Sequence, residues 1–268
     1  MPLACVLLLA TLLSWQRFVP PAPLPHADRA GYAPVNGVRL WYAEFGRGTP
    51  VILLHGGAAN SRWWRQQIPA LRTRFRVIVL DNRGHGRSTG TGERLTFDRM
   101  ASDVVALMGY LHIRRAAVVG WSDGANIGLS MAIHSPQRVT KLFAFGGNSS
   151  PAGLRPFSPT AASKAFDREA RQEYRALSPT PKNVDAMMEA DEQLDATQPH
   201  FTSQELRSIR VRTWIVDGDR DQFIKRSDTD YLASQIPNAG ELILPDVSHS
   251  APLRNPDLFN QVLLLFLR

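Results

Sequence analysis

Ser122 is the third residue of a Gly-Trp-Ser-Asp-Gly sequence that lies between two apolar stretches of different character. The stretch before it, residues 116–119, is short and β-branched, as expected of a strand buried on both faces. The stretch after it, residues 125–133, is longer and rich in helix-forming residues. Small residues beside a serine at such a strand-to-helix turn allow close packing and hold its hydroxyl in an exposed, strained position. The pattern predicts a nucleophile at Ser122, and the alternative interpretation is an ordinary turn with a capping serine.

A histidine near the end of the chain has the position expected of a general base. A serine hydroxyl is a weak nucleophile until a base takes its proton, and the base needs a carboxylate that holds its tautomer. In hydrolases with this kind of turn, the chain order is serine, acid, histidine. His249 follows a predicted strand and precedes the last predicted helix, so it alone among seven histidines has both the order and the position. His26 precedes the predicted fold. The others are assigned to exposed, packing or turn positions: His55, His85, His112, His134 and His200.

The acid must come from a loop that follows a strand between the serine and this histidine. One loop offers three aspartates after the apolar residues 213–216, namely Asp217, Asp219 and Asp221. Asp217 lies at the strand end, and Asp219 lies just past a glycine where the turn is tightest. Asp221 is far enough along the loop to reach back over the sheet edge, so it is the predicted acid, with Asp219 as the alternative.

A glycine-rich turn follows the predicted strand at residues 51–54. The turn begins His-Gly-Gly, and glycines there let backbone N–H groups face a ligand without side-chain obstruction. We expect the oxyanion hole to consist of the N–H of Gly57 and the N–H of Asp123, the residue after the nucleophile. A plain glycine turn is the alternative.

Strand-like and helix-like stretches alternate through most of the chain. The predicted strands are 38–45, 50–54, 77–81, 116–120, 141–145, 211–217 and 241–244. The predicted helices are 62–72, 96–110, 124–134, 229–236 and 256–267, the last with Asn255 as N-cap and Pro256 at its first position. This alternation predicts an α/β fold, with a mostly parallel central sheet flanked by helices on both faces.

One long segment interrupts the alternation. Residues 148–210 contain prolines, many charges and helical patterns but no strand of buried character. Because a structureless loop of that length is rare in a compact domain, we expect a small helical cap over the sheet. The predicted organisation is a hydrolase-like domain at 31–268 with the cap inserted at about 148–210.

The composition is that of a globular protein with a sizeable core. Hydrophobic residues make up 44% of the 268 residues and charged residues 21%. The net charge is +7, but the 31 lysines and arginines are scattered and form no run longer than a pair. A dispersed positive charge indicates a solvated surface, so we expect no nucleic-acid partner.

Residues 1–30 differ from the rest and are expected to form a signal peptide followed by a linker. Leu3 to Trp15 is an almost unbroken apolar run, too short to span a bilayer comfortably but matching the core of a secretory signal. We therefore expect a periplasmic or secreted protein. No Lys or Arg precedes the run, which leaves two alternatives. One is an uncleaved anchor, which would be the one expected membrane contact, and the other is a cytoplasmic location. The single cysteine, Cys5, lies in this segment, which excludes an internal disulfide.

With these residues in place, residues 35–268 resemble the alpha/beta-hydrolase fold. The resemblance rests on His-Gly-Gly at 55–57, Asp-Asn-Arg-Gly-His-Gly-Arg-Ser at 81–88, the serine pentapeptide at 120–124, Gly-Asp-Arg-Asp at 218–221 and Ser-His at 248–249. The serine pentapeptide and the short cap most resemble the valacyclovir-hydrolase-like branch of serine esterases. The resemblance implies a triad of Ser122, Asp221 and His249. It also implies a substrate-binding role for Asp123, whose counterpart in that branch holds the substrate's α-amino group; the alternative is a charge that stabilises the helix start.

The predicted function is hydrolysis of small-molecule carboxylic esters through an acyl-enzyme, with no metal and no cofactor. A carbon–carbon bond hydrolase or a thioesterase would use the same triad, and a ligand-binding receptor of the same fold is a third possibility. Haloalkane dehalogenase and epoxide hydrolase chemistry are disfavoured because both need an aspartate at the position of Ser122. The acyl group, the leaving group and the oligomeric state are not predicted.

Overall fold

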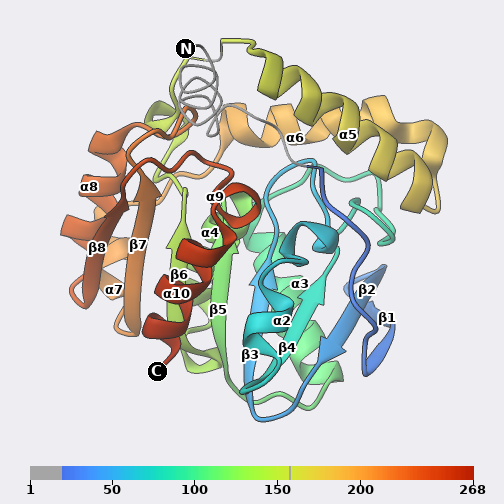
Figure 1. The fold of residues 1–268 in the computed structure, drawn as a ribbon, viewed down its shortest axis with the longest axis horizontal. Helices are drawn as coiled ribbons and strands as arrows, with labels where there is room; N and C mark the ends of the chain where they lie inside the picture. The colour runs from blue at the N-terminus through green and yellow to red at the C-terminus, as the bar shows by residue number, and fades with distance from the viewer. Residues whose placement is uncertain (1–19, 157) are drawn as a thin grey trace, which may run out of the picture.

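The computed structural model describes residues 20–156 and 158–268, which form one eight-stranded sheet with helices on both faces (Figure 1). The strand order is β1-β2-β4-β3-β5-β6-β7-β8. The strands are β1 (Arg29–Val35), β2 (Val38–Phe45), β3 (Thr49–Leu54), β4 (Phe75–Leu80), β5 (Ala116–Trp121), β6 (Val139–Phe145), β7 (Arg212–Gly218) and β8 (Ala239–Leu244). From β4 to β8 all neighbours are parallel, and β1 and β2 are antiparallel additions at one edge. The predicted fold class is confirmed.

The hairpin at the sheet edge was missed in part by the sequence analysis. Strand β1 begins at Arg29, within the segment expected to be leader and linker. Asn36 and Gly37 join it to β2 with φ angles of 45° and 78°, the left-handed pair that a tight hairpin needs. The Asn-Gly dipeptide was therefore a usable signal for this strand.

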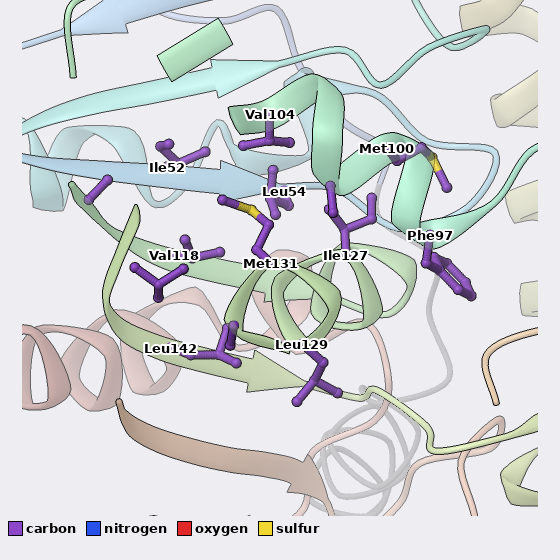
Figure 2. Packing of buried hydrophobic residues seen from close by; sticks show 14 of the residues in the cluster. Ile52, Leu54, Phe97, Met100, Val104, Val118, Ile127, Leu129, Met131 and Leu142 are labelled. Atoms are coloured by element: carbon purple, nitrogen blue, oxygen red, sulfur yellow. The ribbon is translucent and has the colours of Figure 1, made fainter. Parts of the chain in front are cut away.

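Alternate residues along each strand supply two separate cores. On one face, residues such as Ile52, Val118 and Leu142 pack against helices α3 (Phe97–Tyr110) and α4 (Asp123–His134), as Figure 2 shows. Helices α7 (Ser203–Ser208) and α8 (Arg226–Gln235) extend the cover on this face through Leu206 and Leu232. Burial on both faces explains why the central strands are continuously apolar.

The opposite face is covered by the first and last helical segments of the domain. These are the 3-10 helix η2 (Ser61–Trp64) with α2 (Ile68–Leu71), and α9 (Ala251–Arg254) with α10 (Pro256–Leu267). The helix expected at 62–72 is broken into two because Pro69 cannot continue a helical hydrogen-bond ladder. Helix α10 has the expected bounds, but Asn255 makes no side-chain capping bond among the described residues.

Two helices of the segment after β6 form a separate layer across one end of the sheet (Figure 1). They are α5 (Ala161–Leu177) and α6 (Val184–Thr197), and they pack together through a small cluster that includes Tyr174 and Met187. Short 3-10 turns η3 (Pro136–Arg138), η4 (Pro151–Gly153) and η5 (Pro181–Asn183) complete the elements. Helices α5 and α6 are called the cap below, whereas α7 lies against α4 and α8.

The apolar run expected to be a signal sequence lies within residues 1–19, outside the described part of the chain. Within the described part, no helix is both long enough and apolar enough to cross a bilayer.

Candidate active site

Ser122 occupies a strained turn between β5 and α4. Its φ and ψ angles are 57° and −122°, in a region of backbone conformation that residues other than glycine rarely adopt. Its backbone N–H donates to the carbonyl of Phe145 at 2.8 Å. Among the described residues its side chain makes no helix-capping bond, so the alternative of a capping serine does not describe this turn.

The flanking glycines are required by close packing. A methyl group at Gly120 would overlap the carbonyl of Gly124, and one at Gly124 would overlap the carbonyl of Leu54. The strand and helix can therefore approach closely only because both positions lack a side chain. This packing holds Ser122 in its strained conformation.

His249 lies beside this turn and is hydrogen-bonded to Asp221. Its Nδ1 is 2.6 Å from Asp221 Oδ2, and both side chains are buried. The His249 ring centroid is 6.3 Å from that of Trp121, the residue before the serine. A carboxylate on Nδ1 fixes the tautomer in which Nε2 can accept a proton.

Of the candidate acids, Asp221 contacts the histidine and Asp219 does not. Asp221 Oδ1 accepts the N–H groups of Phe223 at 2.7 Å and Ile224 at 2.9 Å. Burial alone would raise the pKa of Asp221, but the nearby His249, the Asp217 side chain and the N–H of Ile224 hold that pKa below its usual value. Asp219 is exposed and accepts the N–H of Val247 at 3.2 Å.

Asp217, the third candidate, is a buried acid behind this pair. It accepts the Thr229 hydroxyl at 3.0 Å and the N–H of Gly218 at 2.8 Å. Burial and then the charge of Asp221 raise the pKa of Asp217 to about 9. Asp217 is therefore a neutral acid at pH 7, next to an ionised one.

The glycine turn lies directly against the serine. A methyl group at Gly56 would be 3.0 Å from Ser122 Cβ, and a methyl group at Gly57 would be 2.8 Å from Asp123 Oδ2. The structure thus brings together Gly57 and Asp123, the two residues whose N–H groups were expected to form the oxyanion hole.

Two cap carboxylates lie beside the candidate site and were missed by the sequence analysis. Asp191 and Asp195 are four residues apart on α6, so they share one face of that helix. The Asp195 carboxyl is hydrogen-bonded with that of Asp123. The spacing on a predicted cap helix was a signal, but nothing in the local pattern indicated that this face meets α4.

Crowding of these carboxyls changes their protonation. Burial, then the charges of Asp195 and Asp191, raise the pKa of Asp123 well above its usual value. The surrounding protein, and then the charge of Asp191, raise the pKa of Asp195 to about 7. In the described residues, no group of three or more His, Cys, Asp or Glu side chains is arranged to hold a metal ion.

Comparison with known proteins identifies the family. Residues 49–186 match the alpha/beta hydrolase fold family. The chain belongs to this family. An alpha/beta hydrolase of Caulobacter sp. (strain K31), RutD, assigned to carbamate hydrolysis, is 30% identical over 242 residues, which cover 81% of this chain and 90% of RutD.

Another relative in this family lies in the branch that the serine pentapeptide resembles. The serine hydrolase BPHL of Mus musculus, a valacyclovir hydrolase, is 28% identical over 249 residues, or 87% of this chain and 84% of BPHL. Among solved structures, a serine hydrolase involved in carbazole degradation, CarC, matches 89% of this chain and 98% of its own with a TM-score of 0.75. At 23% identity, this last match supports the fold alone. The relatives together support a hydrolase.

Proposed function

We propose that this protein is a serine hydrolase that cleaves carboxylic esters through an acyl-enzyme, with Ser122, His249 and Asp221 as its triad. The observation that carries the proposal is the strained φ of 57° at Ser122, on a turn next to a buried histidine and aspartate joined at 2.6 Å. Strain of this kind persists where the surrounding structure imposes it, and it displays a nucleophile at the carboxyl edge of the sheet.

The mechanism follows from the groups in reach. Ser122 Oγ attacks the ester carbonyl carbon while His249 Nε2 takes the hydroxyl proton, and Asp221 stabilises the imidazolium. The N–H groups of Gly57 and Asp123 stabilise the negative oxygen of the tetrahedral intermediate. Collapse expels the alcohol, which receives the proton from His249. Water, activated by the same histidine, then hydrolyses the acyl-enzyme and restores Ser122.

Asp123 is also the proposed contact for a cationic substrate group. Its buried carboxyl faces Gly57, beside the position of the acyl group. An arriving ammonium would offset the burial and the neighbouring charges that raise the pKa of this acid, so an α-amino acyl ester is the favoured substrate class. The kinship to BPHL supports this assignment. The relatives favour no single leaving group, and a thioester or a carbon–carbon bond substrate would need no different triad.

A covalent probe and one substitution test the triad. We expect a fluorophosphonate to label Ser122, and Ser122→Ala to abolish both labelling and turnover on a panel of short acyl, amino-acyl and thio esters, with a loss of several orders of magnitude in kcat. Near-native activity in the alanine variant would overturn the assignment. Tight binding of a ligand by both forms, without turnover, would indicate a receptor.

Export is the proposed fate of the chain, supported by the apolar run from Leu3 to Trp15. Expressed in a Gram-negative host, the protein should occur in the periplasmic fraction, shortened by roughly 20 to 30 residues. Full-length protein confined to the cytoplasm would contradict export.

A further inference from the structure

The glycine turn that carries one proposed oxyanion donor contains a strained residue of its own. The N–H of Ala59 donates to the carbonyl of Gly56 at 3.3 Å, which closes a four-residue turn. Ala58, the third residue of this turn, has a φ of 52°. The third residue of a turn favours glycine when its φ is positive, because a Cβ atom would then lie close to the backbone carbonyl oxygen that follows it. An alanine in this conformation needs contacts from outside the turn to hold it.

The cap supplies those contacts. Asp191 Oδ2, on α6, accepts the N–H of Ala58 at 2.6 Å. The Ala58 side chain lies in the same apolar cluster as Tyr174 of α5 and Met187 of α6. Both the backbone and the side chain of this one residue are therefore held by cap helices.

Asp191 is itself held by a histidine of the hydrolase body. His85 Nε2 lies 3.0 and 2.9 Å from the two carboxylate oxygens of Asp191, and its Nδ1 lies 2.9 Å from the carbonyl of Arg83. Both ring nitrogens face acceptors, an arrangement that the doubly protonated ring satisfies. Burial opposes that charge, but Asp191 outweighs it and raises the pKa of His85. The neighbouring His55 is the opposite case, because burial lowers its pKa to about 4.

From these contacts we infer that Asp191 is a positioning residue, which holds the Gly57–Ala58 peptide so that the Gly57 N–H points at the oxyanion. Gly57 has no side chain to restrict its rotation, so its N–H direction depends on the peptides on either side. Gly56 is packed against Ser122 on one side, and Asp191 fixes Ala58 on the other. The role makes formation of the oxyanion hole dependent on the docked cap, and it rests on the proposed function.

The chain offers a matched control. Glu173, on α5, also ties the cap to this segment of the body, through Asn60 Nδ2 at 2.9 Å and Arg62 Nη1 at 2.6 Å. Its carboxylate is buried like that of Asp191, but it contacts residues beyond the turn. Loss of Glu173 therefore weakens the attachment of the cap without removing the bond to the Ala58 N–H.

The experiment compares Asp191→Ala, Asp191→Asn and Glu173→Gln on p-nitrophenyl butyrate, whose neutral acyl group avoids any effect through Asp123. Active sites are counted with a fluorophosphonate. We expect Asp191→Ala to lower kcat by about 10- to 100-fold with KM changed less than about threefold, as for a misplaced oxyanion donor. Asp191→Asn, which retains an acceptor oxygen, should recover most of kcat. Glu173→Gln should stay within about threefold of wild type.

A transition-state analogue separates positioning from loss of structure. Phenylboronic acid forms a tetrahedral adduct with a serine nucleophile, and its inhibition constant should rise in Asp191→Ala by about the same factor by which kcat falls. If that variant does not fold, His85→Gln, which removes the imidazole that holds Asp191, takes its place. In His85→Gln, kcat and the affinity for the boronate should each fall by about tenfold.

An unchanged kcat in folded Asp191→Ala would overturn the inference, as would a loss of kcat in Glu173→Gln equal to that in Asp191→Ala. If Asp191→Ala does not fold and His85→Gln is used in its place, an unchanged kcat in His85→Gln would overturn the inference. Wild-type protein that neither turns over the ester nor reacts with the fluorophosphonate would refute the proposed function, and the inference with it.

Discussion

Two groups of aspartates, one beside His249 and one at the cap, are built differently. Behind the histidine, Asp217 and Asp221 both come from β7 and the loop that follows it. At the cap, Asp123 comes from α4, while Asp191 and Asp195 come from α6. The first group is assembled within about five residues of chain, and the second only when two distant helices meet.

The two groups nevertheless follow one electrostatic rule. In each, one acid faces a histidine and accepts at least one backbone N–H, as Asp221 and Asp191 do. Its neighbour is buried beside that acid and is raised in pKa, as Asp217 and Asp123 are. A facing histidine, and not burial alone, separates the two acids of each group, because Asp217 also accepts two hydrogen bonds and its pKa is nevertheless raised. The first group can therefore serve the histidine, whereas the second contains one acid of raised pKa whose ionised form a nearby cation would favour.

The largest expected effect concerns the acid that contacts the histidine. Asp221→Asn should lower kcat by about 10³- to 10⁴-fold, because an amide cannot stabilise the imidazolium or hold its tautomer. Asp219→Asn is the control in the same loop and should stay within about threefold. Steady-state kinetics on a neutral ester measure both. Equal losses in the two variants would remove the distinction between these acids.

At the cap, the expected effect is on selectivity. An ammonium–carboxylate hydrogen bond of roughly 1.5 to 3 kcal/mol should favour a valine ester over the matching isovalerate ester by about 10- to 150-fold in kcat/KM. Asp123→Asn should remove most of that preference while leaving the isovalerate ester nearly unaffected. The comparison is made at a pH where the amine is protonated. A wild type without preference would leave Asp123 as a helix-stabilising charge whose N–H serves the oxyanion hole.

The smallest expected effect is on stability. The pKa of Asp217 is raised from 3.8 to about 9 in the folded state. Between these two pH values, the folded protein therefore holds a proton that the unfolded chain has released. The free energy of unfolding must then fall as pH rises through that range. Asp217→Asn mimics the neutral acid and should raise the free energy of unfolding by about 1 to 2 kcal/mol at pH 8.5, which corresponds to a rise in Tm of about 2 to 8 °C. The gain in Tm at pH 5 should be smaller.

Differential scanning calorimetry at the two pH values measures this dependence. Asp219→Asn, at an exposed acid, should show no such trend. A gain in Tm that is the same at pH 5 and pH 8.5 would mean that Asp217 is ionised in the folded protein.

Local patterns were sufficient for much of the fold and for part of the site. The alternation of buried strands and helices predicted the parallel sheet, because side-chain periodicity is a property of each segment alone. The position of Ser122 followed from its flanking glycines, whose role is steric and local. Loop length favoured Asp221 over Asp219, and the structure shows the contact between Asp221 and His249.

Other features depend on contacts between segments far apart in the chain. Asp191 meets His85 across 106 positions and Ala58 across 133, and no periodicity within either segment encodes that meeting. Protonation is decided in the same way, since a pKa depends on burial and on charges brought near by folding. The sequence thus specifies which groups could react, and the docking of the cap on the sheet edge determines which of them are charged and where their hydrogen bonds point.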